Sequence, residues 1–122
     1  MKILVVDDDP DQSIIRCMLL GHHGFETIRA SDAAAALRVA VAQHPDCAVV
    51  DVRLPGETTG LNLVRDLKDA LPELIIFILT GADPERLRNH PETQAAQEII
   101  SKGSSSKILL DKLKRISAQR AA

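Results

Sequence analysis

The chain has 122 residues, of which 45% are hydrophobic and 26% charged, and its formal net charge is −2. These values predict one globular domain over residues 1–122, and they argue against disorder and against direct nucleic-acid binding. No apolar run approaches the roughly 18 residues of a membrane span, and the amino-terminal residues resemble no signal peptide. We therefore expect a cytoplasmic protein that does not bind membranes.

Five short apolar runs predict β-strands. Short apolar runs of this kind are typical of strands that are covered on both faces, as in a parallel sheet. In chain order the runs are Ile3–Val6, Glu26–Ala30, Cys47–Val52, Leu74–Leu79 and Glu98–Ile100.

Helical patterns separate the runs, and the first helix has readable ends. Asp9 and Pro10 predict an N-cap followed by proline at the first helical position. Gly21 and Gly24 mark the end of this helix. Its apolar residues form one stripe of Ile14, Ile15, Met18 and Leu19.

The next two helices are also marked at their ends. Ser31 is expected to cap an Ala-rich helix that runs through Ala42, and a third helix follows Gly60 and ends before Pro72. The residues of the second helix expected to face inward are Leu37, Ala40 and Val41.

Prolines interrupt the region of the fourth helix. Asp83 and Pro84 predict its start, and Pro91 should break it near His90. We therefore expect a short or irregular fourth helix. A serine cluster, Ser104–Ser106, caps a fifth helix that carries Ile108, Leu109, Leu113 and Ile116.

Strand and helix thus alternate five times, which predicts an α/β fold, a (βα)5 doubly wound sheet of five parallel strands. In such sheets ligands bind beyond the carboxyl ends of the strands. Polar residues gather at those ends in this sequence: Asp7, Asp8, Asp51, Thr80 and Lys102.

These polar residues together indicate a phosphoryl site. Carboxylates about 4 Å apart repel by roughly 4 kcal/mol at an effective dielectric near 20, and protonation or binding of a hard divalent cation relieves this repulsion. Oxygen-only ligands suit Mg²⁺. Lys102 and Thr80 can contact phosphoryl oxygens, while one carboxylate acts as the nucleophile. Each residue alone is weak evidence, but their occurrence at four strand ends is informative.

The same residues carry a family resemblance over the whole chain. Asp8 and Asp51 are 43 residues apart, Asp51 and Thr80 are 29 apart, and Thr80 and Lys102 are 22 apart. With these intervals the chain resembles the CheY-like receiver domain of bacterial two-component response regulators. The matching segments are Ile3–Pro10, Asp51–Gly56, Ile78–Gly81 and Lys102.

The resemblance implies a flavodoxin-like strand order of 2-1-3-4-5 and a role for each site residue. Asp51 would accept a phosphoryl group from a phosphohistidine on a sensor histidine kinase. Lys102 would pair with that group, and Thr80 would move toward it and change the surface of the fourth helix, fifth strand and fifth helix. The Mg²⁺ ligands would be Asp8, Asp51 and the backbone carbonyl of Arg53, with Asp7 acting through water.

Two residues depart from the family pattern. Gly103 replaces the usual proline after the lysine and leaves that loop more permissive. Ile99 stands where the family commonly has Tyr or Phe, so output by rotation of an aromatic ring is not expected. Signalling would then use backbone and helix movement.

The leading hypothesis is a phosphoacceptor switch that catalyses only its own phosphorylation and dephosphorylation. It would be a monomer or weak dimer that acts on a protein partner, or on an output domain absent from this chain. The alternative is a pseudo-receiver, an interaction module that works without phosphorylation. A flavodoxin-like site fits poorly because acidic residues follow the first strand, and a haloacid-dehalogenase-type phosphatase would leave Asp51 unexplained.

The carboxyl-terminal region leaves a further question open. The stretch from Lys102 to Arg120 has six basic residues and a single acid, Asp111. It is either the solvated face of the fifth helix or a docking surface for an acidic partner.

Overall fold

The computed structural model describes residues 1–52, 57–81, 84–102 and 106–121. A five-stranded parallel sheet lies at its centre, in the order β2-β1-β3-β4-β5. This confirms the predicted fold and strand order. The strands are β1 (Lys2–Val6), β2 (Glu26–Ala30), β3 (Cys47–Val52), β4 (Ile75–Thr80) and β5 (Glu98–Ser101), each within a residue or so of the predicted run.

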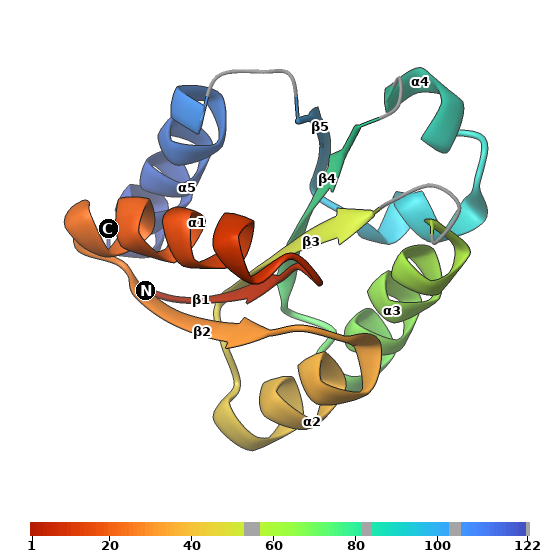
Figure 1. Ribbon diagram of the computed structural model, residues 1–122, viewed down its shortest axis with the longest axis horizontal. Helices are drawn as coiled ribbons and strands as arrows, with labels where there is room; N and C mark the ends of the chain where they lie inside the picture. The colour runs from red at the N-terminus through yellow and green to blue at the C-terminus, as the bar shows by residue number, and fades with distance from the viewer. Residues whose placement is uncertain (53–56, 82–83, 103–105, 122) are drawn as a thin grey trace.

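Helices cover both faces of the sheet. Figure 1 shows α1 and α5 on one face and α2 and α3 on the other, with α4 near the carboxyl end of β4. The helices are α1 (Pro10–His22), α2 (Ala33–Gln43), α3 (Glu57–Ala70), α4 (Pro84–Leu87), the 3₁₀ helix η1 (Pro91–Ala95) and α5 (Ser106–Ala121). No helix in these described ranges is long and apolar enough to cross a membrane.

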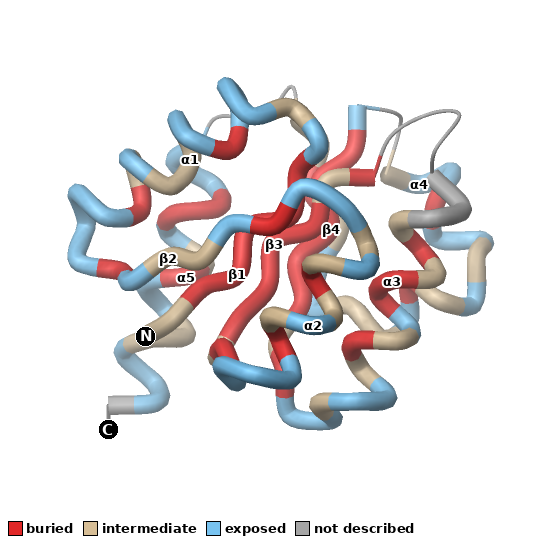
Figure 2. Tube along the Cα trace, turned by 60° about the horizontal axis from the view of Figure 1, so that its bottom comes forward, coloured by how far each residue is buried: buried red, intermediate tan, exposed pale blue. Residues whose placement is uncertain are grey.

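The core has two halves, one on each face of the sheet, because successive strand side chains point to opposite faces. In β1, Leu4 and Val6 belong to the half under α2 and α3, whereas Ile3 and Val5 belong to the half under α1 and α5. The central strands are buried along nearly their whole length, as Figure 2 shows. This burial explains why their sequences read as continuous apolar runs.

The helix caps confirm one prediction and correct another. The Asp9 side chain accepts hydrogen bonds from the backbone N–H groups of Asp11 and Gln12, as expected of an N-cap. For α2 the prediction of Ser31 was wrong, because Asp32 is the N-cap and accepts from the N–H of Ala35 at 2.7 Å. A carboxylate at this position also interacts favourably with the positive end of the helix dipole.

Helix α3 begins earlier than expected, at Glu57 rather than after Gly60. Gly60 lies within its first turns, where a Cβ atom would come 2.9 Å from Cγ2 of Val52. The glycine therefore permits a close approach between α3 and β3.

The apolar stripe of α1 faces solvent rather than the core. Ile15 is 62% exposed and Met18 68% exposed, while Ser13 and Leu20 are buried. The polar cap at Asp9 fixes the start of the helix beside the carboxyl end of β1, and the side with Ser13 turns inward. In α2 the expectation for Val41 was also wrong, because that side chain is exposed.

The fourth helix is short, as predicted. α4 has only four residues, and the chain re-forms as η1 from Pro91, whose ring cannot continue an α-helix. The predicted cap at Asp83 lies outside the described residues, as do Ser104 and Ser105 of the predicted cap of α5.

Candidate functional site

The register of the sheet brings the predicted site residues to one edge. Val6 of β1 is aligned with Val50 of β3, so Asp7 follows β1 beside Asp51. Thr80, at the end of β4, is aligned with Val52 on one side and with Ser101 of β5 on the other. Since Lys102 follows Ser101, the four strand ends converge as the sequence predicts.

Lys102 and Asp51 form an ion pair across the end of β4. The Lys102 Nζ lies 2.5 Å from Asp51 Oδ2, and the Asp51 side chain is only 1% exposed. The backbone N–H of Lys102 also donates to the carbonyl of Thr80 at 2.7 Å. This bond continues the β4–β5 pairing by one residue and fixes the base of the lysine. Gly103 itself lies outside the described residues.

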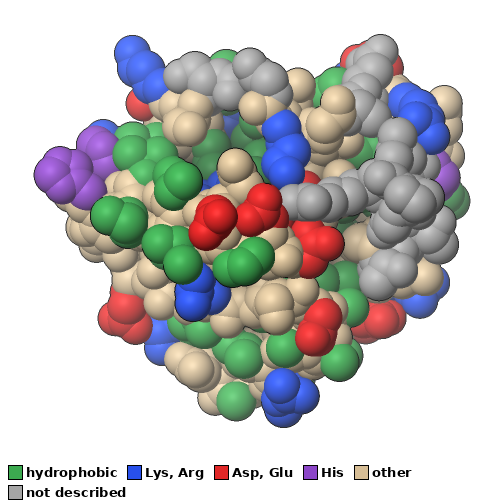
Figure 3. Space-filling view, viewed as in Figure 1, with side chains coloured by type: hydrophobic (Ala, Val, Ile, Leu, Met, Phe, Trp, Pro, Cys, Tyr) green, Lys and Arg blue, Asp and Glu red, His purple; other side chains and the backbone are tan. Residues whose placement is uncertain are grey.

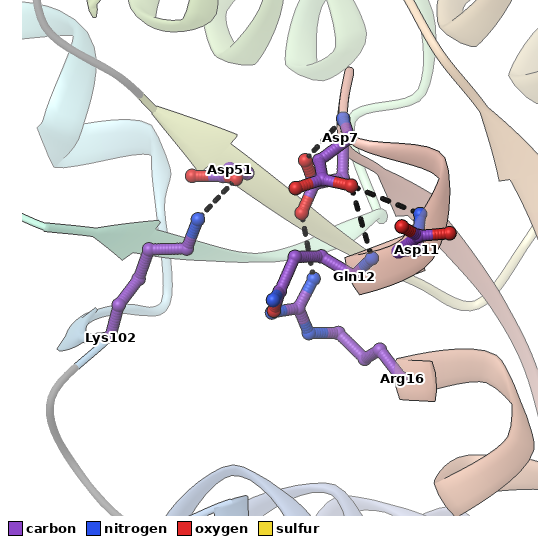
Figure 4. Close-up of polar contacts among 7 residues, drawn as sticks. Asp7, Asp11, Gln12, Arg16, Asp51 and Lys102 are labelled. Carbon is purple, nitrogen blue, oxygen red and sulfur yellow. Dashed lines mark hydrogen bonds and ion pairs between the residues drawn. The ribbon is translucent and has the colours of Figure 1, made fainter. Parts of the chain in front are cut away.

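Three hydrogen bonds fix the position of Asp7, one through its backbone and two through its side chain. Its backbone N–H donates to the carbonyl of Ala30, and its Oδ1 accepts from the N–H of Asp9 at 2.9 Å. Its Oδ2 accepts from Arg16 Nη1 at 3.2 Å, and this side chain of Asp7 is fully buried. Figure 4 shows Arg16 and Lys102 reaching the two carboxylates from different elements.

Arg16 is a residue of the site that the sequence analysis missed. It lies three positions after buried Ser13 and four before buried Leu20, so all three share one face of α1. An arginine on the buried face of a helix is the signal that would have pointed to a charged partner. The sequence analysis considered only the apolar stripe of this helix, and Arg16 is not part of that stripe.

Burial and neighbouring charges move the pKa values of the two carboxyls in opposite directions. Burial raises the pKa of Asp51 above its usual range, and the nearby Asp7 adds to this, while Lys102 opposes it. Burial also acts to raise the pKa of Asp7, but hydrogen bonds from the Asp9 backbone, Asp51 and Arg16 outweigh it and lower the pKa. The proton therefore stays preferentially on Asp51 when the two compete.

A cavity of about 280 Å³ opens beside these carboxylates and is lined by Asp7, Asp8 and Asp51 together with Ser31, Asp32 and Gly60. Asp8 is exposed at its rim. The space-filling view in Figure 3 shows acidic side chains gathered on this face.

The donor set fits Mg²⁺, which binds oxygen ligands and usually uses one or two carboxylates together with water. In the described part of the chain, no three His, Cys, Asp or Glu side chains are close enough to hold a metal by themselves. A cation here would therefore rely on water or backbone oxygens as well. The predicted carbonyl ligand, Arg53, lies outside the described residues.

Comparison with known proteins assigns the chain to a family. The model of the response regulator receiver domain matches residues 3–114. The chain therefore belongs to the response regulator receiver domain family, a class of phosphorylation-based signalling domains.

Two curated relatives and one solved structure show how similar the chain is to other members. It is 31% identical over 102 residues to the probable transcriptional regulatory protein TcrX of Mycobacterium tuberculosis, covering 84% of this chain but 43% of that protein. It is 28% identical over 119 residues to protein PilH of Pseudomonas aeruginosa, covering 96% of this chain and 98% of PilH.

The solved structure to which this chain is similar is that of the response regulator TrrA of Thermotoga maritima in complex with Mg²⁺ and BeF. It has a TM-score of 0.83 and 26% identity, and the match covers 93% of this chain and 96% of that one.

Proposed function

We propose that this chain is a phosphoacceptor switch in which Asp51 takes a phosphoryl group from a phosphohistidine of a sensor histidine kinase. A carboxylate oxygen of Asp51 would attack phosphorus, forming an O–P bond as the P–N bond to the donor histidine breaks. The electron pair of that bond returns to the imidazole. Hydrolysis of the acyl phosphate by water would reset the switch.

The observation that carries this proposal is the Lys102–Asp51 ion pair. A phosphoryl group on Asp51 would bring its oxygens next to the Lys102 ammonium, which would pair with them after transfer. Thr80 is buried at the end of β4, between β3 and β5, and would contact the same oxygens. A bound Mg²⁺ would neutralise further charge on the phosphoryl group. Asp8 and Asp51 would hold it together with the carbonyl of Arg53, and Asp7 would act through water.

The surface that would change lies over α4, β5 and α5. A shallow cavity of about 420 Å³ is lined there by Ile99 and Ile108, and an ion pair joins Lys112 to Glu98 at 2.6 Å. Ile99 packs against the core half under α2 and α3. Because an aliphatic side chain has no ring to turn, the output would follow movement of the backbone beyond Thr80.

The donor would approach beside α1. Helix α1 begins directly after the acidic residues of the site and carries the exposed apolar residues Ile14, Ile15 and Met18. Figure 3 shows hydrophobic side chains gathered over α1 beside the acidic ones. An apolar patch that borders a reaction centre suits a protein donor, which must dock while its histidine reaches Asp51.

Intact mass after incubation with acetyl phosphate and Mg²⁺ tests the proposal. We expect a gain of one phosphoryl group that is absent from the Asp51→Asn variant and absent with EDTA. If no group is gained, beryllofluoride is the second probe, read by amide shifts in NMR. Failure of both would overturn the phosphoacceptor function and favour the pseudo-receiver.

A further inference from the structure

The guanidinium of Arg16 is held inside the protein against a fully buried carboxylate. The Arg16 side chain is 15% exposed, its partner Asp7 is 0% exposed, and 3.2 Å separates Nη1 from Oδ2. Arginine stays protonated at every relevant pH, so this positive charge is permanent. Burying it is costly without a paired anion, which means that the pair with Asp7 keeps Arg16 in this position.

The two buried carboxylates of the site are each paired with a cation of the chain itself. Four carboxylates line the cavity, those of Asp7, Asp8, Asp32 and Asp51. Two cations, Arg16 and Lys102, contact two of these carboxylates. Lys102 pairs with Asp51 and Arg16 pairs with Asp7. Each buried carboxylate thus has its own internal counter-charge.

The second oxygen of Asp7 is engaged as well. Its Oδ1 accepts from the Asp9 N–H, which leaves Oδ2 as the oxygen that Arg16 contacts. A divalent cation drawn to the Asp7 carboxylate would therefore meet a positive charge already in contact with it.

We propose that Arg16 is a positioning residue that acts as a built-in counter-cation for Asp7, stabilising the metal-free site and weakening its affinity for Mg²⁺. This inference rests on the proposed function, because that function supplies the Mg²⁺. The opposite role, in which Arg16 orients Asp7 to favour the cation, predicts a change of affinity in the other direction.

The first test is an NMR titration of ¹⁵N-labelled protein with MgCl₂, since the chain has no Trp or Tyr to report binding by fluorescence. Arg16→Met removes the charge but keeps an unbranched chain. It should bind Mg²⁺ roughly threefold to tenfold more tightly, the effect of one unit charge a few ångströms away in a partly solvated site. Arg16→Lys keeps the charge and should stay within about twofold of the wild type.

Arg29→Met is the matched control. Arg29 is exposed and precedes Ala30, whose carbonyl accepts a hydrogen bond from the Asp7 N–H. The Arg29→Met substitution therefore removes one positive charge from the neighbourhood of Asp7. Because water screens an exposed charge, the Mg²⁺ affinity of Arg29→Met should differ from that of the wild type by no more than about twofold. If Arg16→Met binds Mg²⁺ as the wild type does or more weakly, the inference is overturned.

The second test compares urea unfolding in EDTA and in saturating MgCl₂. Arg16→Met should be less stable than the wild type in EDTA, and Mg²⁺ should remove much of the difference because tighter binding adds stability to the folded state. An equal difference in both buffers would mean that Arg16 only supports the fold. Arg16→Gln, which can still donate to Asp7 but carries no charge, replaces the Met variant if that variant does not fold.

The two proposals fail in different ways. A wild-type chain that binds no Mg²⁺ would contradict the proposed function, and this inference with it. A wild type that binds Mg²⁺ with the same affinity as Arg16→Met and Arg16→Gln would contradict the role of Arg16 alone.

Discussion

The Lys102 ammonium lies 2.5 Å from the Asp51 carboxylate, although the two residues are 51 positions apart. Asp51 is on β3 and Lys102 directly follows β5, and β4 lies between these two strands. The distance is bridged because Lys102 continues the pairing of β5 with β4, through its N–H bond to the carbonyl of Thr80. The lysine therefore opposes the effect of burial, which raises the pKa of Asp51.

Replacing Lys102 with Met should raise the pKa of Asp51 further, because the burial of the carboxyl then has no cation to offset it. A ¹³C NMR titration of the Asp side-chain carboxyls measures this directly. Uptake of phosphoryl from acetyl phosphate should fall by at least about tenfold, since the group loses its cation. Lys114→Met, on the exposed side of α5, is the control and should change neither property. An unmoved Asp51 titration in the Lys102 variant would contradict the role of the ion pair.

Asp51→Asn should stabilise the metal-free protein at pH 7. The folded state binds the Asp51 proton more tightly than the unfolded chain does, where the pKa is near 3.8. This proton adds stability below that value, and the benefit is lost as the pH rises through the raised pKa of the folded protein. Asn mimics the protonated acid at every pH, so it should raise the unfolding temperature at pH 7.

Differential scanning calorimetry in EDTA across pH 3.5 to 8 checks this. The advantage of the Asn variant should shrink toward pH 3.5, where the wild-type carboxyl is protonated in the folded state and mostly protonated in the unfolded chain. A variant that is less stable than the wild type at pH 7 would mean that the Lys102 ion pair outweighs the cost of burying Asp51.

Much of this site can be predicted from the sequence, because the ends of the strands can be predicted from it. Apolar runs fix where each strand stops, and a parallel sheet brings those ends together, so Asp51 and Lys102 were found without coordinates. Pro91 likewise predicted the break after α4, since its ring excludes a continuing helix.

The sequence did not predict how α1 is rotated about its axis, and so which of its faces meets the core. Periodicity shows that Ile14, Ile15 and Met18 share a face, but it does not say whether that face meets the core or a partner. Arg16 was missed for the same reason. Ser31 and Asp32 are both good capping residues, and only the geometry of the β2–α2 turn selects Asp32.

Gly60→Ala should destabilise the fold by about 1–3 kcal/mol, as other overpacked cores do. The added Cβ would stand 2.9 Å from Cγ2 of Val52, so α3 or β3 must shift. Urea unfolding measures the loss. Gly21→Ala is the matched control, because it lies in α1 with nothing within 4 Å of its Cβ position. That control should gain roughly 0.5–1 kcal/mol from the better helix propensity of alanine. Equal effects at the two glycines would refute the close contact.

Ile15→Asp should slow phosphoryl transfer from a protein donor while leaving transfer from acetyl phosphate unchanged. Ile15 is exposed on α1, so the substitution adds a charge to the apolar patch that we propose as the donor's docking surface without disturbing the core. The donor is a purified sensor kinase, chosen from a panel because it labels the wild-type chain after autophosphorylation. With that kinase the rate should fall by about tenfold or more, the effect of losing a central apolar contact.

Val41→Asp provides the comparison, because Val41 is a similarly exposed apolar residue, on α2. It should slow neither reaction if docking is confined to α1. If Ile15→Asp also takes up phosphoryl from acetyl phosphate more slowly, the substitution has impaired the phosphorylation site itself and not the docking of the donor. An unchanged kinase rate in Ile15→Asp would exclude the α1 patch as the donor's contact surface, because a buried charge opposite an apolar partner is costly wherever the two surfaces meet.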